Sequence, residues 1–278
     1  QIAERLAAHD ALLFVGGRGL RTTLYSVAKF PQKKAWLGHN AAAQPPAGRF
    51  ELARVADLRD SLSRVRALLA AGHKNHAIKS RRPELALPAP RAKLHPTRAM
   101  HALLERFRDA IWVDESGLST SDVRQWMSLE AGEYLINGSG GIGWGLAAAV
   151  GAAIAQPKRQ VVAVIGDGSA LYASEALWTA GHHGAKLLLV VLSNRRYATL
   201  NEAASRLAGG PLMAFTIEPP VIDFSGLATL YGFRYRAAAT ERALNAFLGK
   251  IRGRVHANTL LELKLDPAVK PVTASRHF

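Results

Sequence analysis

The chain has 278 residues, of which 49% are hydrophobic and none is cysteine, and its formal net charge is +15. The length and the apolar content predict a globular protein with one large or two smaller domains. The lack of cysteine excludes disulfides, thiolate metal sites and a thiol nucleophile.

The positive charge can reflect nucleic-acid binding, the binding of an anionic cofactor or substrate, or simply a charged surface. The basic residues are dispersed, and no aromatic residues interleave with the densest group, Lys74, Lys79, Arg81 and Arg82. We therefore expect no nucleic-acid partner. The sequence shows neither a signal peptide nor an apolar run of about 18 residues, so we expect a cytoplasmic protein with no membrane partner.

Residues 1–72 are predicted to form part of an α/β domain. The expected elements are a helix at 2–8, strands at 11–15, 35–38 and 52–56, and a helix at 58–71 that Asp57 caps. The turn Gly16-Gly17-Arg18-Gly19 suggests a nucleotide site, but it lacks the full G-x-G-x-x-G pattern and no acidic residue ends the next strand. We interpret it as a structural turn.

Residues 73–96 are predicted to be a linker, because Pro83, Pro88, Pro90 and Pro96 break any helix there. The second domain then occupies residues 97–278. It begins with a helix at 100–108, which Thr97 is expected to cap, and a strand at 110–113. Asp114 and Glu115 follow that strand, but adjacent side chains on a strand point in opposite directions, which argues against paired acid/base work.

Two loops of this domain could approach a ligand. The hydroxyl cluster Ser116, Ser119, Thr120 and Ser121 follows a strand end, where it could donate hydrogen bonds to a ligand or simply cap a helix. A short strand at 134–137 leads to the glycine-rich loop 138–145, which carries no charge and lets backbone groups touch a flat ligand. A helix rich in small residues is expected at 146–155.

The stretch from Val161 to Tyr197 organises the rest of the chain. An apolar strand at 161–165 ends at Gly166-Asp167-Gly168-Ser169, a helix starts near Ser174, and a second apolar strand at 187–192 ends at Ser193-Asn194. This order predicts a parallel βαβ unit, in which ligands bind at the carboxyl ends of the strands. If the two strands are neighbours, the oxygens of Asp167 and Asn194 converge on one hard cation such as Mg²⁺ or Ca²⁺.

A loop at 198–220 comes next, followed by a helix at 224–230, a strand at 233–236, a helix at 241–252 and a strand at 259–263. Strands that alternate with helices predict an α/β fold with a doubly wound parallel sheet.

These motifs together resemble the signature of a known family. GDGS at 166–169 is followed by Ala176-Leu177-Trp178-Thr179, by Asn194 and by Tyr197-Ala198-Thr199-Leu200, and it is preceded by Gly140-Gly141-Ile142-Gly143. The chain resembles the thiamine-diphosphate-dependent 2-oxo acid decarboxylases and acetolactate synthases, and it looks most similar to benzoylformate decarboxylases. The resemblance covers most of residues 97–270 and, more faintly, residues 9–72. It implies a diphosphate-binding domain preceded by part of the central domain.

The resemblance also implies a thiamine diphosphate cofactor with Mg²⁺. Asp167 and Asn194 match the side-chain ligands of the metal, and Arg196 matches a ligand that binds through its backbone carbonyl. Leu200 matches a position in the substrate pocket, and Ile142 matches the apolar wedge that bends the cofactor. The other positions expected at the cofactor are Gly140, Gly141, Gly166, Gly168, Ser169, Tyr197 and one hydroxyl of the 116–121 cluster, for which we take Ser116.

The implied activity is decarboxylation of a 2-oxo acid, followed by protonation or carboligation. In the resembled family a glutamate of an N-terminal domain activates the cofactor, and we expect this chain alone to be inactive. A catalytic histidine of the benzoylformate decarboxylases would fall near Thr22 and Thr23, where the sequence has none. Ala198 and Ser193 also replace the usual Gly and Asn.

Three alternatives stay open at this point. The chain could be an acetolactate synthase-like carboligase, a non-catalytic relative that serves as a binding or regulatory module, or a Mg²⁺-dependent phosphate-ester hydrolase. The intact pair of metal ligands favours a cofactor-binding enzyme over a module. We expect a small 2-oxo acid as substrate and a homo-oligomer of at least two subunits.

Overall fold

The computed structural model describes residues 9–16, 33–43, 50–72, 86–126, 133–137, 140–208, 216–251 and 253–269. The chain divides into two compact units, residues 1–83 and 84–278. The expected helix at 2–8, the turn residues 17–19, Thr22 and Thr23, and most of the expected linker lie outside the described residues. Residues 86–96 belong to the second unit, in which Leu94 and His95 are buried.

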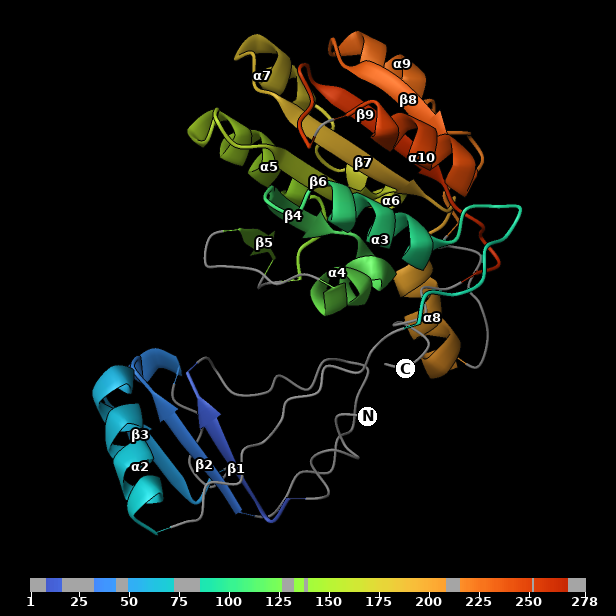
Figure 1. Ribbon diagram of the computed structural model, residues 1–278. Coiled ribbons are helices and arrows are strands. Elements are labelled where there is room, and N and C mark those ends of the chain that lie inside the picture. The colour runs from blue at the N-terminus through green and yellow to red at the C-terminus, as the bar shows by residue number, and fades with distance from the viewer. Residues whose placement is uncertain are drawn as a thin grey trace. The chain divides into compact units, whose positions relative to one another are not determined.

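The first unit contains a small parallel sheet in the order β1-β2-β3 (Figure 1). Its strands are β1 (Ala11–Val15), β2 (Lys33–Gly38) and β3 (Leu52–Val55), followed by α2 (Leu58–Gly72). Asp57 caps α2, as predicted, because its Oδ1 accepts a hydrogen bond from the Asp60 N–H at 2.8 Å. Gly16 has a φ of +71° and its N–H donates to the Leu37 carbonyl, so at this residue the turn is a structural one.

The second unit is built on a six-stranded sheet whose paired strands are all parallel, in the order β5-β4-β6-β7-β9-β8. The strands are β4 (Ile111–Glu115), β5 (Tyr134–Ile136), β6 (Val161–Gly166), β7 (Leu187–Ser193), β8 (Arg234–Ala238) and β9 (Thr259–Lys264). The two central strands, β6 and β7, are buried on both faces, which explains why they are continuous apolar runs. The predicted doubly wound α/β fold is confirmed.

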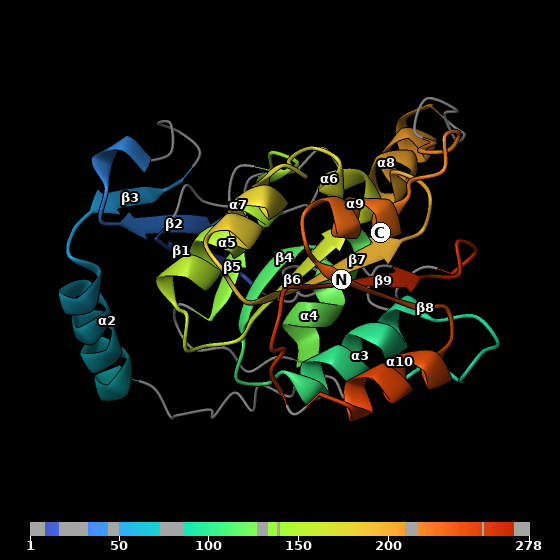
Figure 2. The ribbon, with the colours of Figure 1, turned by 90° about the horizontal axis from the view of Figure 1, so that it is seen from above.

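Helices cover both faces of this sheet (Figures 1 and 2). One face packs against α3 (Pro96–Arg106), α4 (Thr120–Trp126) and α10 (Glu241–Gly249), and the other against α5 (Trp144–Ala155), α7 (Ala176–His182) and α9 (Phe224–Leu230). Alternate residues of β6 serve the two cores, since Val162 and Val164 pack with the first set and Ala163 and Ile165 with the second.

Two predicted details of this unit are wrong. Residues 198–208 form α8 (Ala198–Ala208) rather than the predicted loop, because this run of mostly Ala, Leu, Glu and Arg favours a helix. Helix α3 begins at Pro96 and is capped by His95, whose ring Nδ1 accepts from the Thr97 N–H at 3.1 Å. The Thr97 hydroxyl instead donates to Asp122 at 2.9 Å, which ties α3 to α4.

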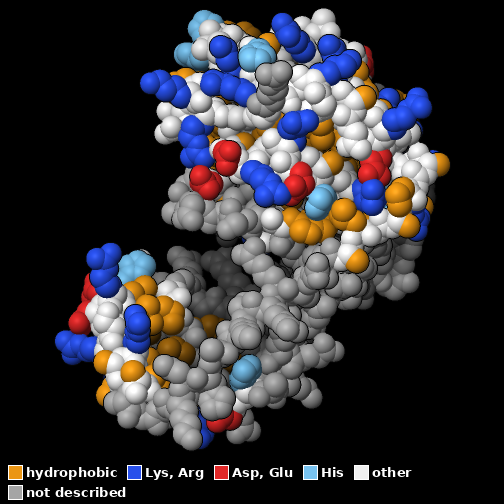
Figure 3. All heavy atoms as spheres, viewed as in Figure 1, with side chains coloured by type: hydrophobic (Ala, Val, Ile, Leu, Met, Phe, Trp, Pro, Cys, Tyr) orange, Lys and Arg blue, Asp and Glu red, His pale blue; other side chains and the backbone are white. Residues whose placement is uncertain are grey.

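The surface and the helix lengths bear on the expected partners. On the face shown in Figure 3, the lysines and arginines that are coloured lie among acidic, apolar and other side chains rather than in one patch. Among the described residues, no helix is both long enough and apolar enough to span a bilayer.

Candidate functional site

The strand order of the sheet reverses at β4. From β4 the chain passes to the edge strand β5 and then returns to β6 on the opposite side of β4. Such a reversal of strand order is the position at which open α/β sheets bind ligands. The register aligns Glu115 with Ile165 and Gly166 with Leu192, so the ends of β4, β6 and β7 meet at one edge.

Asp167 lies at the centre of this edge, at the start of the short helix α6 (Asp167–Ala170), and its side chain is only 3% exposed. Its Oδ1 accepts from the Gly168 N–H at 2.9 Å, and its Oδ2 accepts from the N–H groups of Asn194 at 2.8 Å and Arg195 at 2.6 Å. Arg195 has a φ of +64°, within a turn that aims these two consecutive N–H groups at one oxygen. The structure therefore brings Asp167 and Asn194 together, as the strand pattern predicted.

The carboxylate of Asp167 is buried without a cationic partner. In the described part of the chain, backbone N–H groups hold it and no lysine or arginine forms an ion pair with it. Burial raises its pKa to about 6, although the hydrogen bonds from Arg195, Gly168 and Asn194 oppose that shift. A buried acid in this environment favours the approach of a cation.

The neighbouring oxygens fit a hard divalent cation. The Asn194 Oδ1 accepts from the Arg196 N–H at 3.1 Å, and the Arg196 carbonyl accepts from the Ala198 N–H at 2.9 Å. Each of these two oxygens has two lone pairs. A carboxylate, an amide oxygen and a carbonyl oxygen are ligands that suit Mg²⁺. Their role as its ligands stays a prediction.

The predicted cofactor residue Gly166 ends β6, and the predicted diphosphate residues Gly168 and Ser169 lie in α6, which follows directly. A Cβ atom on Gly168 would lie 2.3 Å from Cε1 of Tyr197, so the tyrosine ring packs directly on this turn. Burial raises the pKa of Tyr197, and the neighbouring Tyr172 adds to the shift. Gly168 and Tyr197, both of which the sequence assigned to the cofactor, are thus in contact.

The glycine-rich loop lies at the same edge and is attached to β4. The φ angles of Gly140 and Gly143 are +80° and +91°, which only glycine adopts readily. Glu115 Oε1 accepts from the Gly143 N–H at 2.5 Å and Oε2 accepts from the Gly145 N–H at 2.8 Å. Ile142 is 44% exposed beside them. Sequence reasoning missed Glu115, because its partners lie 28 and 30 residues further along the chain.

Two other residues of this loop were considered in the sequence. The carbonyl of Gly141 accepts from the Asn137 side-chain amide at 2.5 Å, which closes the loop on itself. Gly138 lies outside the described residues.

Ser116 is engaged by the buried carboxylate of Asp114. Its hydroxyl and its N–H both donate to Asp114 Oδ1, at 2.5 Å and 2.9 Å. Thr120 donates to the same oxygen at 3.2 Å, and Tyr134 donates to Oδ2 at 2.5 Å. Because Asp114 and Glu115 have separate partners, they do not form an acid/base pair. The Ser116 proton is already used, and its contact with a diphosphate stays a prediction.

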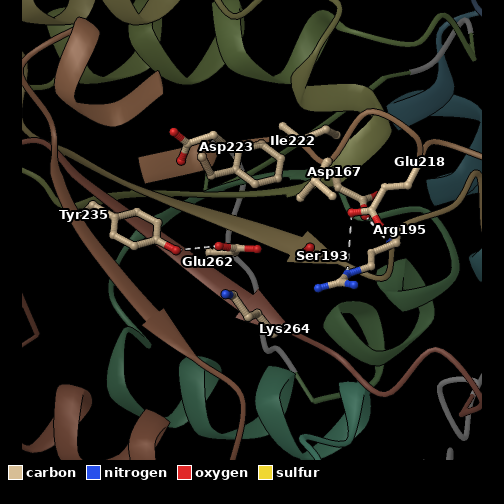
Figure 4. A pocket seen from close by; sticks show the side chains of 11 residues that line it. Asp167, Ser193, Arg195, Glu218, Ile222, Asp223, Tyr235, Glu262 and Lys264 are labelled. Carbon is tan, nitrogen blue, oxygen red and sulfur yellow. Dashed lines mark hydrogen bonds and ion pairs between the residues drawn. The ribbon is translucent and has the colours of Figure 1, made fainter. Parts of the chain in front are cut away.

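A polar cavity of about 300 Å³ adjoins Asp167 on the side of β7, β8 and β9 (Figure 4). In it the Tyr235 hydroxyl donates to Glu262 at 2.5 Å, and Arg195 pairs with Glu218 at 3.6 Å. Of the predicted site residues only Asp167 lines this cavity. Leu200, the predicted substrate-pocket residue, lies on α8 and is 40% exposed.

Comparisons with known proteins agree with this geometry. The family described as "Thiamine pyrophosphate enzyme, C-terminal TPP binding domain" matches residues 115–258. Over 142 residues the chain is 39% identical to benzoylformate decarboxylase of Pseudomonas aeruginosa, covering 51% of this chain and 26% of that protein. Over 180 residues it is 28% identical to acetolactate synthase isozyme 1 large subunit of Escherichia coli, covering 60% of this chain and 32% of that protein.

Solved structures extend the likeness to nearly the whole chain. A thiamine diphosphate-dependent 4-hydroxybenzoylformate decarboxylase of Rhodococcus jostii matches with a TM-score of 0.74 and 31% identity, over 96% of this chain and 51% of that one. Benzoylformate decarboxylase of Polynucleobacter necessarius shares the fold, with a TM-score of 0.83 and 18% identity over 98% of this chain and 52% of that one. The chain thus spans about half of these proteins. It belongs to the thiamine pyrophosphate enzyme family, through its C-terminal TPP-binding domain.

Proposed function

We propose that this chain is the cofactor-binding portion of a thiamine-diphosphate- and Mg²⁺-dependent enzyme that decarboxylates a 2-oxo acid. The observation that carries the proposal is the carboxylate of Asp167 next to Asn194 at a switch point of the sheet. It is 3% exposed, and in the described part of the chain only backbone N–H groups hold it. A cation that bridges this carboxylate and a diphosphate would compensate both negative charges.

Different residues at the carboxyl edge of the sheet would bind the metal and the diphosphate. Asp167, Asn194 and the Arg196 carbonyl would hold Mg²⁺, while Gly168 and Ser169 would contact the diphosphate. When bound, thiamine diphosphate supplies the nucleophilic carbon and the electron sink for loss of carbon dioxide. The protein binds and orients it, and the exposed Ile142 and the bare backbone at Gly140 suit contact with a flat ring.

The proposed substrate is a small 2-oxo acid that contacts Leu200 on α8. Support comes from the likeness to the Pseudomonas and Rhodococcus enzymes, whose names state benzoylformate and 4-hydroxybenzoylformate decarboxylation. Carboligation is the second candidate, because the chain is also similar to the Escherichia coli acetolactate synthase subunit over 180 residues. The enzyme would act as a homo-oligomer of at least two subunits.

Calorimetry tests the cofactor proposal directly. Thiamine diphosphate should bind the chain in the presence of Mg²⁺ and lose measurable affinity when EDTA removes the metal. Asp167→Ala should abolish this binding, since it removes the charged ligand of the metal. Asp109→Ala is the matched control, because it removes an exposed carboxylate that precedes β4, at the opposite edge of the sheet. Equal affinity with and without Mg²⁺ would refute the proposal.

Turnover separates the enzyme from a non-catalytic binding module. We expect the chain alone to be inactive toward a panel of 2-oxo acids, and a longer protein that also supplies the residues of the other half of its relatives to be active. Release of carbon dioxide without a ligated product favours the decarboxylase, and a 2-hydroxyketone product favours the carboligase. Binding without turnover by the longer protein would identify a module.

A further inference from the structure

We propose that Glu115 is a positioning residue, whose carboxylate holds the backbone of the loop 140–145 in the form that presents Gly140 and Ile142 to the cofactor. The role toward the cofactor rests on the proposed function. The attachment of the loop rests on the geometry alone, so the two parts can fail separately.

Both oxygens of Glu115 are used. Oε1 accepts from the Gly143 N–H at 2.5 Å, and Oε2 accepts from the Gly145 N–H at 2.8 Å. Hydrogen bonds to an ionised acceptor are shorter and roughly twice as strong as neutral ones. A single side chain at the end of β4 therefore fixes two points of a backbone that glycine otherwise leaves free.

Glu115 also completes the start of α5. The N-cap residue of this helix is Gly143, and no side chain of its own forms a capping hydrogen bond. The first N–H groups of a helix lack partners within the helix, and a negative charge there is stabilising. Glu115, at the end of β4, supplies both the hydrogen-bond acceptor and the negative charge for these N–H groups. The N–H groups of Gly143 and Gly145 are therefore not available to a diphosphate.

The glycines of the loop show how closely it is held. A Cβ atom on Gly145 would lie 2.7 Å from Glu115 Oε2, and one on Gly143 would lie 2.5 Å from the Cβ of Tyr172. The backbone is therefore packed between β4 and Tyr172 at these residues. Among the described residues, a Cβ atom on Gly140 would meet nothing within 4 Å, so the loop is held at Gly143 and Gly145 and is open at Gly140.

Amide hydrogen exchange, measured by NMR on the chain without cofactor, tests the attachment. Glu115→Gln keeps the shape of the side chain, but its NH₂ group cannot accept from an N–H. We expect exchange at Gly143 or Gly145 to become at least about tenfold faster, as the loss of one such bond predicts. Exchange in the core of β7 should not change.

Glu175→Gln is the matched control, because Glu175 is an exposed residue that precedes α7 without forming a capping hydrogen bond. Unchanged exchange at both glycines in Glu115→Gln would overturn the proposal. If that variant does not fold, Glu115→Asp serves the same purpose, since its shorter side chain cannot reach both N–H groups.

Cofactor titration tests the second part. With Mg²⁺ present, we expect Glu115→Gln to bind thiamine diphosphate about tenfold more weakly than the unmodified chain and Glu175→Gln to bind it equally well. Faster exchange with unchanged affinity would overturn the role toward the cofactor and leave the attachment standing. If the unmodified chain does not bind the cofactor, the proposed function fails, while the exchange experiment still decides the attachment.

Discussion

Two glycine-containing turns lie at the carboxyl edge of the sheet, and both are held by hydrogen bonds between a carboxylate and backbone N–H groups. One turn supplies the acceptor, and the other supplies the donors. In the turn after β6 the carboxylate belongs to the turn itself, and N–H groups that follow β7 donate to Asp167. In the loop before α5 the N–H groups belong to the loop, and Glu115 at the end of β4 accepts from them. Each turn is therefore held in part by residues at the end of a neighbouring strand.

The difference shows which negative charge is available to a ligand. Glu115 sits at a helix start, where its charge is already compensated by N–H groups and by the helix dipole. Asp167 is more deeply buried, and its pKa is raised to about 6. We infer that Glu115 acts on the structure of the site and that Asp167 attracts the metal.

Crowding the loop should have the largest effect on stability. A Cβ atom on Gly145 would lie 2.6 Å from the Ile165 side chain and 2.7 Å from Glu115, so Gly145→Ala should cost roughly 1–3 kcal/mol. On the same helix a Cβ atom on Gly151 would meet nothing within 4 Å, and Gly151→Ala should gain roughly 0.5–1 kcal/mol. Urea unfolding measures both. Equal effects of the two substitutions would mean that Glu115 does not confine the loop.

The turn that follows β7 should respond to a change at Arg195, which holds a φ of +64°. A left-handed conformation costs a residue with a side chain about 1–2 kcal/mol, and glycine avoids that cost. We expect Arg195→Gly to be more stable than Arg195→Ala by about 1 kcal/mol in thermal unfolding, since both variants lose the same ion pair with Glu218. If alanine were equally stable, the turn would not be strained.

Unlike Asp167 and Glu115, Glu241 has a cationic partner, and its substitution should have the smallest effect on stability. Arg98 donates to both oxygens of Glu241, at 2.6 Å and 2.5 Å, and this hydrogen-bonded pair lowers the pKa of Glu241 from its ordinary value of 4.5. The pair lies near the surface, so Glu241→Gln should cost less than about 1 kcal/mol at pH 7.

The sign of the pH dependence follows from the lowered pKa. The stability that Glu241 contributes is fully present above pH 4.5 and is lost as the pH falls through the lower folded value. Denaturant unfolding at pH 7 and pH 3 should therefore show a smaller difference between Glu241→Gln and the unmodified chain at pH 3 than at pH 7. A difference of equal size at both pH values would assign it to packing instead.

Much of the fold could be predicted because its central strands are buried on both faces. Such strands must be apolar throughout, and the runs at 161–165 and 187–192 allow no other placement in a doubly wound sheet. The convergence of Asp167 and Asn194 follows from the same pattern, because neighbouring parallel strands end at one edge. Helix α8 was missed although its composition favours a helix.

The contacts within the site could not be predicted, because they join residues that are distant in the sequence. Nothing near Glu115 in the sequence indicates that it accepts from Gly143 and Gly145. The contact of Tyr197 with Gly168 is likewise a product of the folded edge. Ser116 was chosen for its position after a strand, but its hydroxyl has a nearer acceptor in Asp114.

The long separation between these partners has a consequence for the order of folding. The contacts of Asp167 with Asn194 and Arg195 need β6 and β7 to be paired, and the contacts of Glu115 with Gly143 and Gly145 close segments of 28 and 30 residues. Contacts between distant segments carry a large loop-closure cost and tend to form late. The contacts at the carboxyl edge of the sheet are therefore expected to form last, so substitutions there should accelerate unfolding more than they slow folding.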